Sequence, residues 1–190
     1  MKITLEIAGT IFGFLAVYLT IKENIWCWFF GLIQVVIFVF IFYTAKLYSD
    51  MILHIIYVFL QIYGWYHWKY GGKNENNLQI TKITNTVLWV LLTLVLTFVL
   101  GYLMQLKTDA SFPYPDAFTT TASLVAQYLM IKKKLGSWLF WIVVDIVAIG
   151  IYFNKELYYT TGLYVAFLIM AIIGYFQWKK RYKKDLDYAK

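Results

Sequence analysis

Seven mainly apolar stretches, separated by short polar segments, set the pattern of this chain. Each reaches or nearly reaches the length of about 20 residues that an α-helix needs to cross a membrane. The stretches cover residues 4–21, 26–45, 50–68, 83–105, 114–131, 137–154 and 157–178. The longest connection, "KYGGKNENNLQITK" (69–82), holds a Gly pair and an Asn cluster, which mark a loop. The pattern therefore predicts an all-α polytopic membrane protein with seven transmembrane helices.

The composition agrees with this class. Hydrophobic residues make up 62% of the chain and charged residues 14%, whereas soluble domains have roughly 25% charged residues. The first apolar stretch lacks a basic n-region and a small-residue cleavage site, so we expect a mature span rather than a signal peptide. The single Cys27 excludes an intramolecular disulfide framework and offers no metal cluster.

The distribution of Lys and Arg predicts the orientation. Of the 17 basic residues, 4 lie at the N-terminus or after the second, fourth and sixth stretches, and 13 lie on the other side. The positive-inside rule therefore places the N-terminus outside and the C-terminus in the cytoplasm. We interpret the basic segments as determinants of topology and of contact with anionic lipid, not as a nucleic-acid site.

The chain also resembles itself at a constant offset of 110 residues. Among the less common residues, the matching pairs include Trp28 with Trp138, Gly64 with Gly174, Trp68 with Trp178 and Lys69 with Lys179. The first three and the last three stretches then form two parallel three-helix repeats, and the fourth stretch is a linker helix. Transporters use such repeats, with the substrate near the midplane between them.

This organisation predicts four parts. They are the first repeat (1–70), a loop with the linker helix (71–112), the second repeat (113–180) and a cytoplasmic basic tail (181–190).

The sixth stretch contains three residues that suggest a binding site. Trp138, Trp141 and Asp145 are spaced i, i+3, i+7 and share one helix face. A carboxylate at bilayer depth is expensive and is a functional candidate by default. Two indole rings and a carboxylate suit a flat cationic ligand, through stacking and cation–π attraction. Alternatively, Asp145 hydrogen-bonds another helix, and the tryptophans pack or belong to an interfacial belt.

The two repeats differ at this point. The first repeat has Gly31 in place of Trp141 and Val35 in place of Asp145, and its polar residue at depth is Gln34. Residues with a purely structural role would more easily have stayed the same in both repeats. The difference at the centre therefore favours an asymmetric ligand that binds between them.

A second polar pattern runs along the third stretch. Asp50, His54, Tyr57 and Gln61 are spaced i, i+4, i+7, i+11 and form one stripe, which we expect to face the bundle interior. His54 and Gln61 are candidates for substrate contact or gating, whereas Asp50 is either part of the stripe or a helix cap. Tyr164, which matches His54, and Asn154 are secondary candidates.

Motifs of other chemistry are missing from the sequence. There is no G-x-S-x-G, Walker A or H-E-x-x-H motif. Asp145 has no second acid at mid-span, and the last apolar stretch has no Lys for a retinal Schiff base. We therefore predict no enzymatic activity, no catalytic residue, no metal and no cofactor.

Two segments resemble the Pnu vitamin transporters of bacterial inner membranes. "WLFWIVVD" (138–145) fits their W-x-x-W-x-x-x-N/D motif, and "AKLYSDMILHIIYVFLQIYGWYHW" (45–68) is similar to their third span. The resemblance covers nearly the whole chain, including the three-one-three helix order. It implies a SWEET-like fold of two three-helix bundles around a linker helix.

The resemblance also implies a function. The protein would be a facilitator, most simply of nicotinamide riboside, that rocks between outward-open and inward-open states while a separate cytoplasmic kinase traps the substrate. Trp138, Trp141 and Asp145 would lie at the substrate, and the opposite wall would carry His54, Tyr57, Gln61 and Gln34. Homo-oligomer formation is left open.

Two alternatives stand beside this hypothesis. The motif ends in Asp145, where nicotinamide riboside transporters often have Asn, and relatives in the same family carry thiamine. Both substrates contain a positively charged aromatic ring, so the carboxylate does not choose between them. Proton-coupled transport, with Asp145 or His54 as the titrating group, is the other alternative.

Overall fold

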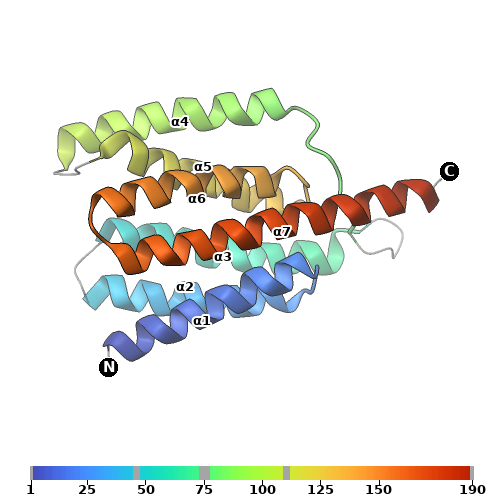
Figure 1. Cartoon of the computed structure of the whole chain (residues 1–190), viewed down its shortest axis with the longest axis horizontal. Coiled ribbons are helices and arrows are strands. Elements are labelled where there is room, and N and C mark those ends of the chain that lie inside the picture. Colours follow the sequence, from blue (N-terminus) through green and yellow to red (C-terminus); the bar gives the residue numbers. More distant parts are fainter. Residues whose placement is uncertain (1, 45–47, 73–77, 109–111, 189–190) are drawn as a thin grey trace. The chain divides into compact units, whose positions relative to one another are not determined.

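The computed structural model describes residues 2–44, 48–72, 78–108 and 112–188, and this part of the chain contains seven α-helices (Figure 1). They are α1 (Lys2–Ile21), α2 (Trp26–Thr44), α3 (Tyr48–Tyr70), α4 (Thr86–Lys107), α5 (Pro113–Ile131), α6 (Ser137–Asn154) and α7 (Tyr158–Tyr188). Each predicted apolar stretch corresponds to one helix. Pro113 opens α5, at a position where the missing N–H costs no hydrogen bond.

The largest difference from the predicted elements lies at the end of the chain. We expected the last helix to finish near residue 178, but α7 continues to Tyr188 through the basic tail. Residues 179–188 contain neither Gly nor Pro, so nothing in that sequence terminates a helix.

Five helices are long and apolar enough to cross a membrane: α1, α2, α4, α6 and α7. The two others, α3 and α5, carry more polar side chains, including the stripe on α3 and a run of three threonines on α5. The expectation of seven spans is therefore supported for five helices, and it stays a prediction for α3 and α5.

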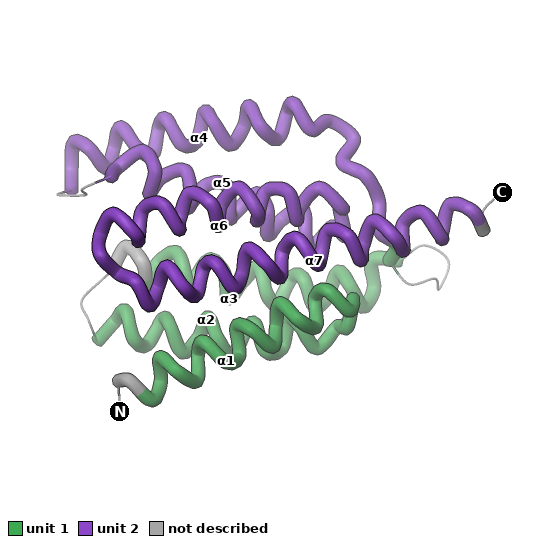
Figure 2. The backbone as a smooth tube through the Cα atoms, viewed as in Figure 1, with its two compact units in different colours: residues 1–79 green, residues 80–190 purple. Residues whose placement is uncertain are grey.

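The chain divides into two compact units, unit 1 (residues 1–79) and unit 2 (residues 80–190) (Figure 2). In unit 1, α2 packs against both α1 and α3. In unit 2, α4 packs against α5, α5 against α6, and α6 against α7.

The start of unit 2 is tied to its own α5–α6 loop. The Thr81 N–H donates to the Lys133 carbonyl (3.0 Å), and the Leu135 N–H donates to the Thr81 carbonyl (2.8 Å). Ile83 follows and lies against Gly136, where an added Cβ would meet its side chain. These contacts attach the segment before α4 to the α5–α6 loop and add to the packing of α4 against α5.

The α1–α2 loop of unit 1 and the α5–α6 loop of unit 2 have the same geometry. Glu23 (φ 56°) and Lys133 (φ 47°) are left-handed residues that end α1 and α5. The next N–H of each loop closes the helix end in the same way, from Asn24 to the Leu19 carbonyl and from Lys134 to the Leu129 carbonyl, both at 2.9 Å. This is the usual hydrogen-bonding pattern of a helix C-terminus with a left-handed residue. The 110-residue register seen in the sequence is thus repeated in the backbone.

A pair of tryptophans joins the last two helices of each three-helix repeat. Trp28 on α2 meets Trp68 on α3 edge to face, with ring centroids 5.3 Å apart and planes at 84°. Trp138 on α6 meets Trp178 on α7 at 5.5 Å and 90°. All four side chains are buried. The matching positions therefore have matching packing roles.

Candidate functional site

Asp145 lies in the middle of α6, and its side chain is only 4% exposed. Among the described residues, none forms a hydrogen bond or an ion pair with its carboxylate. A charge removed from water is costly unless it is paired. No contact among the described residues supports the alternative that Asp145 hydrogen-bonds another helix.

Trp141, one turn before Asp145, is half-buried. Its indole forms no ring pair with any other side chain in the described ranges. The indole of Trp141 therefore keeps part of its surface exposed and has no aromatic partner among the described residues.

Trp138 has different surroundings, although it shares the helix face. Its side chain is 2% exposed, and it packs against Trp178 and Gly174. Its Nε1–H is buried and makes no hydrogen bond within the described part of the chain, as is also true of Trp28. Because the same arrangement recurs in unit 1, the geometry favours the packing alternative for Trp138.

The polar stripe of α3 turns toward α2 within unit 1. The His54 ring lies 4.9 Å from the Phe42 ring, 5.6 Å from the Phe38 ring and 5.9 Å from the Tyr57 ring, between centroids. His54 therefore packs against α2, and an orientation of the stripe toward the bundle interior stays a prediction. The side chain of Asp50, the first residue of the stripe, lies outside the described part of the structure.

Two glutamines of unit 1, Gln34 and Gln61, each lie against a glycine of the neighbouring helix. A Cβ added to Gly31 on α2 would lie 2.7 Å from the Gln61 amide nitrogen. A Cβ added to Gly13 on α1 would lie 2.8 Å from the Gln34 amide nitrogen. Gln61 thus crosses from α3 to α2, and Gln34 from α2 to α1. The sequence analysis missed this role of the two glycines.

Gln61 also lines a groove between α2 and α3. The groove has a volume of about 310 Å³, and its wall includes Trp28, Trp65 and Lys69. That volume is at the lower end of the range typical of small-molecule pockets. Gln61 therefore has its amide against Gly31 and part of its surface on a groove.

The secondary candidates have local partners. Tyr164 on α7 stacks on Tyr152 of α6, with centroids 5.2 Å apart and planes at 18°. The Asn154 side-chain amide donates to the Gly150 carbonyl of its own helix at 2.8 Å. These contacts give Tyr164 and Asn154 structural roles in α6 and α7.

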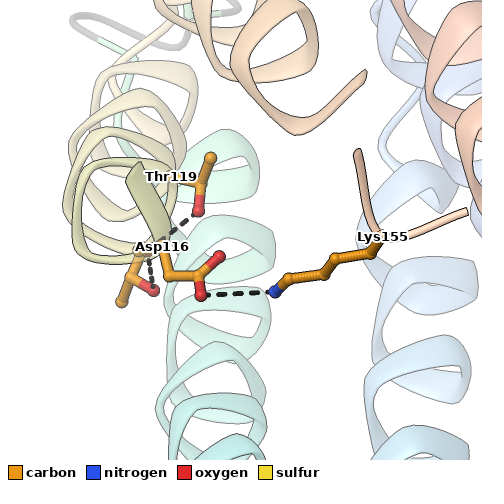
Figure 3. Close-up of polar contacts among 4 residues, drawn as sticks. Asp116, Thr119 and Lys155 are labelled. Carbon is orange, nitrogen blue, oxygen red and sulfur yellow. Dashed lines mark hydrogen bonds and ion pairs between the residues drawn. The ribbon is translucent and has the colours of Figure 1, made fainter. Parts of the chain in front are cut away.

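An ion pair lies at the opposite end of unit 2 from the α5–α6 loop. The Lys155 ammonium, just after α6, is 3.4 Å from the Asp116 carboxylate in the first turn of α5 (Figure 3). The hydroxyls of Thr119 and Thr120 donate to the Asp116 backbone carbonyl. An acidic residue also suits the positive end of the α5 dipole. The sequence analysis did not identify this pair.

No group of three His, Cys, Asp or Glu side chains that could hold a metal ion occurs among the described residues. Cys27 is buried in α2. The candidate binding residues contribute aromatic rings, side-chain amides and one carboxylate.

A family model described as nicotinamide mononucleotide transporter matches residues 3–180. The chain is 29% identical to the nicotinamide riboside transporter PnuC of Escherichia coli (strain K12), over 92% of this chain and 84% of that protein. It is 30% identical to PnuC of Neisseria mucosa, over 90% and 70% of the two chains. The riboflavin/roseoflavin transporter RibM of Streptomyces davaonensis is 20% identical over 95% of this chain and 86% of its own length. These relatives are named as transporters, not enzymes.

The fold is similar to a solved structure. The crystal structure of the vitamin B3 transporter PnuC matches with a TM-score of 0.76 and 29% sequence identity, over 95% of this chain and 82% of that one. The sequence, the structure and these relatives all support an all-helical fold in a membrane.

Proposed function

Because the chain belongs to the nicotinamide mononucleotide transporter family, we propose that it carries a vitamin precursor across the bacterial inner membrane, with nicotinamide riboside as the substrate. The observation that carries the proposal is the buried carboxylate of Asp145, which has no partner among the described residues and lies one turn from the half-buried Trp141. A carboxylate and an indole ring suit the charge and the flat shape of a nicotinamide ring. Relatives named for nicotinamide riboside support this choice.

The charge of the site favours the riboside over the phosphorylated mononucleotide. A phosphate group is normally bound by Arg, Lys or helix N-termini. The Lys and Arg residues of this chain lie outside the apolar stretches or at their ends, and the charged residue at the centre of α6 is Asp145. Placing a phosphate near that carboxylate would add repulsion, whereas a cationic ring would be attracted.

Thiamine is the second candidate, because the motif ends in Asp145 rather than Asn. Thiamine also contains a positively charged aromatic ring. The relative RibM is named as a riboflavin/roseoflavin transporter. Riboflavin is neutral, so a carboxylate would attract it less than a cationic ring.

The residues that we propose as substrate contacts are those that the sequence nominates. In unit 2, Asp145 supplies charge and Trp141 supplies stacking. In unit 1, the proposed polar contacts are His54, Tyr57, Gln61 and Gln34. Trp138, which the motif also nominates, would act on the substrate mainly by fixing α6 through Trp178.

We further propose a SWEET-like three-one-three organisation with repeats at 1–70 and 113–180 and α4 as the linker helix. The matched loops at Glu23 and Lys133 support it, as do the matched Trp pairs. The Lys and Arg distribution supports an outside N-terminus and a cytoplasmic C-terminus.

Transport would proceed by alternating access down the substrate gradient, followed by phosphorylation of the substrate by a separate kinase. The absence of a Walker A motif supports a passive step. In proteoliposomes, uptake should stop when the two concentrations are equal, and an imposed pH gradient should not change that limit. Accumulation driven by the gradient would instead establish proton coupling through Asp145 or His54.

The substrate is tested by a binding screen on the purified protein. The probes are nicotinamide riboside, nicotinamide mononucleotide, thiamine, riboflavin and a deoxynucleoside. The expected result is tightest binding of nicotinamide riboside and weak binding of the mononucleotide. Tightest binding of thiamine would move the assignment to the second candidate, and no binding of any probe would refute the proposed function.

A further inference from the structure

Several described glycines lie where an added methyl group would collide with a neighbour, and four of them, on α1, α2, α3 and α7, meet two kinds of obstacle. At Gly64 and Gly174 the obstacle is a buried indole ring, 2.3 Å and 2.6 Å from the added Cβ. At Gly13 and Gly31 the nearest atoms belong to the terminal amides of Gln34 and Gln61. A buried ring cannot move aside easily, whereas the end of a glutamine side chain can.

Gly13 and Gly31 therefore control where an amide lies more than how two helices pack. With glycine, each amide settles onto the backbone of the neighbouring helix. With alanine, the helices can keep their positions if the amide rotates away, because each glutamine side chain has three rotatable bonds. The two positions differ in this respect from Gly64 and Gly174, where small residues allow close packing.

The two amides have hydrogen-bonding capacity to spare. Both side chains are half-buried, and neither makes a hydrogen bond to another residue in the part of the chain that the structure describes. An amide has two donors and an acceptor, and polar groups at membrane depth normally find a partner. A fixed, unpaired amide is suited to recognise a polar ligand.

The repeat supplies independent support for one of these pairs. The positions that match Gly31 and Gln61 in unit 2 are Trp141 and Ala171. In unit 1 the small residue, Gly31, is on α2 and the large one is on α3. In unit 2 the order is reversed, with the large residue on α6 and the small one, Ala171, on α7. At these matched positions, each unit therefore has a small residue on one helix and a proposed substrate contact on the other.

We propose that Gly13 and Gly31 are positioning residues that hold the amides of Gln34 and Gln61 in place for the transported molecule. This inference rests on the function proposed above. It adds two specificity-determining positions that carry no functional group themselves.

The test is a double-mutant cycle on the full-length protein. Gly31→Ala, Gln61→Ala and the double variant are compared for nicotinamide riboside affinity. Loss of one amide contact should weaken binding about five- to tenfold. Gly31→Ala should show a loss of that size, and the double variant should bind no more weakly than Gln61→Ala alone. Gly13→Ala and Gln34→Ala form a second cycle with the same expectation.

Two controls separate positioning from general disturbance. Gly150→Ala places a methyl group where no atom lies within 4 Å, and it should bind like the wild type. NMR of ¹⁵N-labelled glutamine side chains, with Gln61→Ala to assign the signal, should show the Gln61 amide shifted in Gly31→Ala. This readout does not depend on transport.

The outcomes distinguish a failure of the proposed function from a failure of the positioning role of Gly31. If the wild type binds no probe, the proposed function fails and this inference falls with it. If the wild type binds but Gly31→Ala binds equally well, or its Gln61 signal does not move, only the positioning role is refuted. Additive losses in the double variant would also refute it, because Gly31 would then act without Gln61.

Discussion

Trp138 and Trp178 meet edge to face in unit 2, with ring centroids 5.5 Å apart and planes at 90°. Both side chains are almost completely buried, and Gly174 provides the space that the Trp138 ring occupies. Edge-to-face pairs of aromatic rings are favourable beyond the area they bury. The contact fixes α6 against α7 three residues before Trp141, and thus positions the helix that carries the proposed substrate contacts.

Gly174→Ala should destabilise the protein. The added Cβ would lie 2.6 Å from the Trp138 ring, and overpacking of this kind costs about 1–3 kcal/mol. The measurement is thermal unfolding in detergent. Gly162→Ala is the matched control on the same helix, since no atom lies within 4 Å of its added Cβ. Equal melting temperatures for the two variants would show that the Trp138 contact is loose.

Trp138→Ala should lower the stability of the protein, whereas Trp141→Ala should lower its affinity for the substrate. Removing the buried Trp138 side chain should lower stability by about 3–5 kcal/mol. Removing the half-buried Trp141 ring should leave the melting temperature nearly unchanged and weaken substrate binding about tenfold, since stacking on an aromatic ring contributes about 1–3 kcal/mol. Thermal unfolding and affinity are measured on both variants. A Trp138→Phe variant with normal stability and lost binding would favour direct substrate contact for Trp138.

Much of the helical architecture could be predicted from the sequence, because long apolar stretches and polar loops are local signals. The 110-residue register was also visible, and it reappears in the loops at Glu23 and Lys133. The end of α7 could not be located, since residues 179–188 contain no residue that stops a helix.

The candidate site was harder to resolve. Helical spacing puts Trp138 and Trp141 on one face, but it does not say which ring another helix covers. That depends on Gly174 and Trp178, more than 30 residues away along the chain. The same holds for Gly13 and Gly31, whose effect is visible only where α1, α2 and α3 are in contact.

The ion pair between Lys155 and Asp116 should contribute little to stability. Both side chains are about 30% exposed (31% and 27%), and pairs of this kind usually contribute less than about 1 kcal/mol. Lys155→Ala should therefore lower the melting temperature only slightly, and the difference should shrink as salt is added. A loss of several kcal/mol would mean that this contact holds α5 and α6 together.

The predicted orientation can be checked with single cysteines in a Cys27→Ala background. Lys183→Cys, near the C-terminus, should react with a membrane-impermeant thiol reagent only from the cytoplasmic side. Tyr159→Cys, at the fully exposed start of α7, should react only from outside. The reagent is applied to intact cells and to inverted vesicles. The reverse pattern would overturn the orientation inferred from the basic residues.

Asp145→Asn should weaken a cationic ligand more than a neutral one. The carboxylate is buried without a partner among the described residues, so a cationic ring would supply its counter-charge. Hydrogen bonds and contacts to charged groups contribute about 1.5–3 kcal/mol, which corresponds to a loss of roughly 10- to 100-fold in affinity. Nicotinamide riboside should show this loss, and riboflavin should change by less than about threefold. Asp116→Asn, which removes a carboxylate at the start of α5, is the control and should leave both affinities unchanged. Equal losses for both ligands in Asp145→Asn would show that Asp145 supports the fold of α6, and the proposed charge recognition would have to be abandoned.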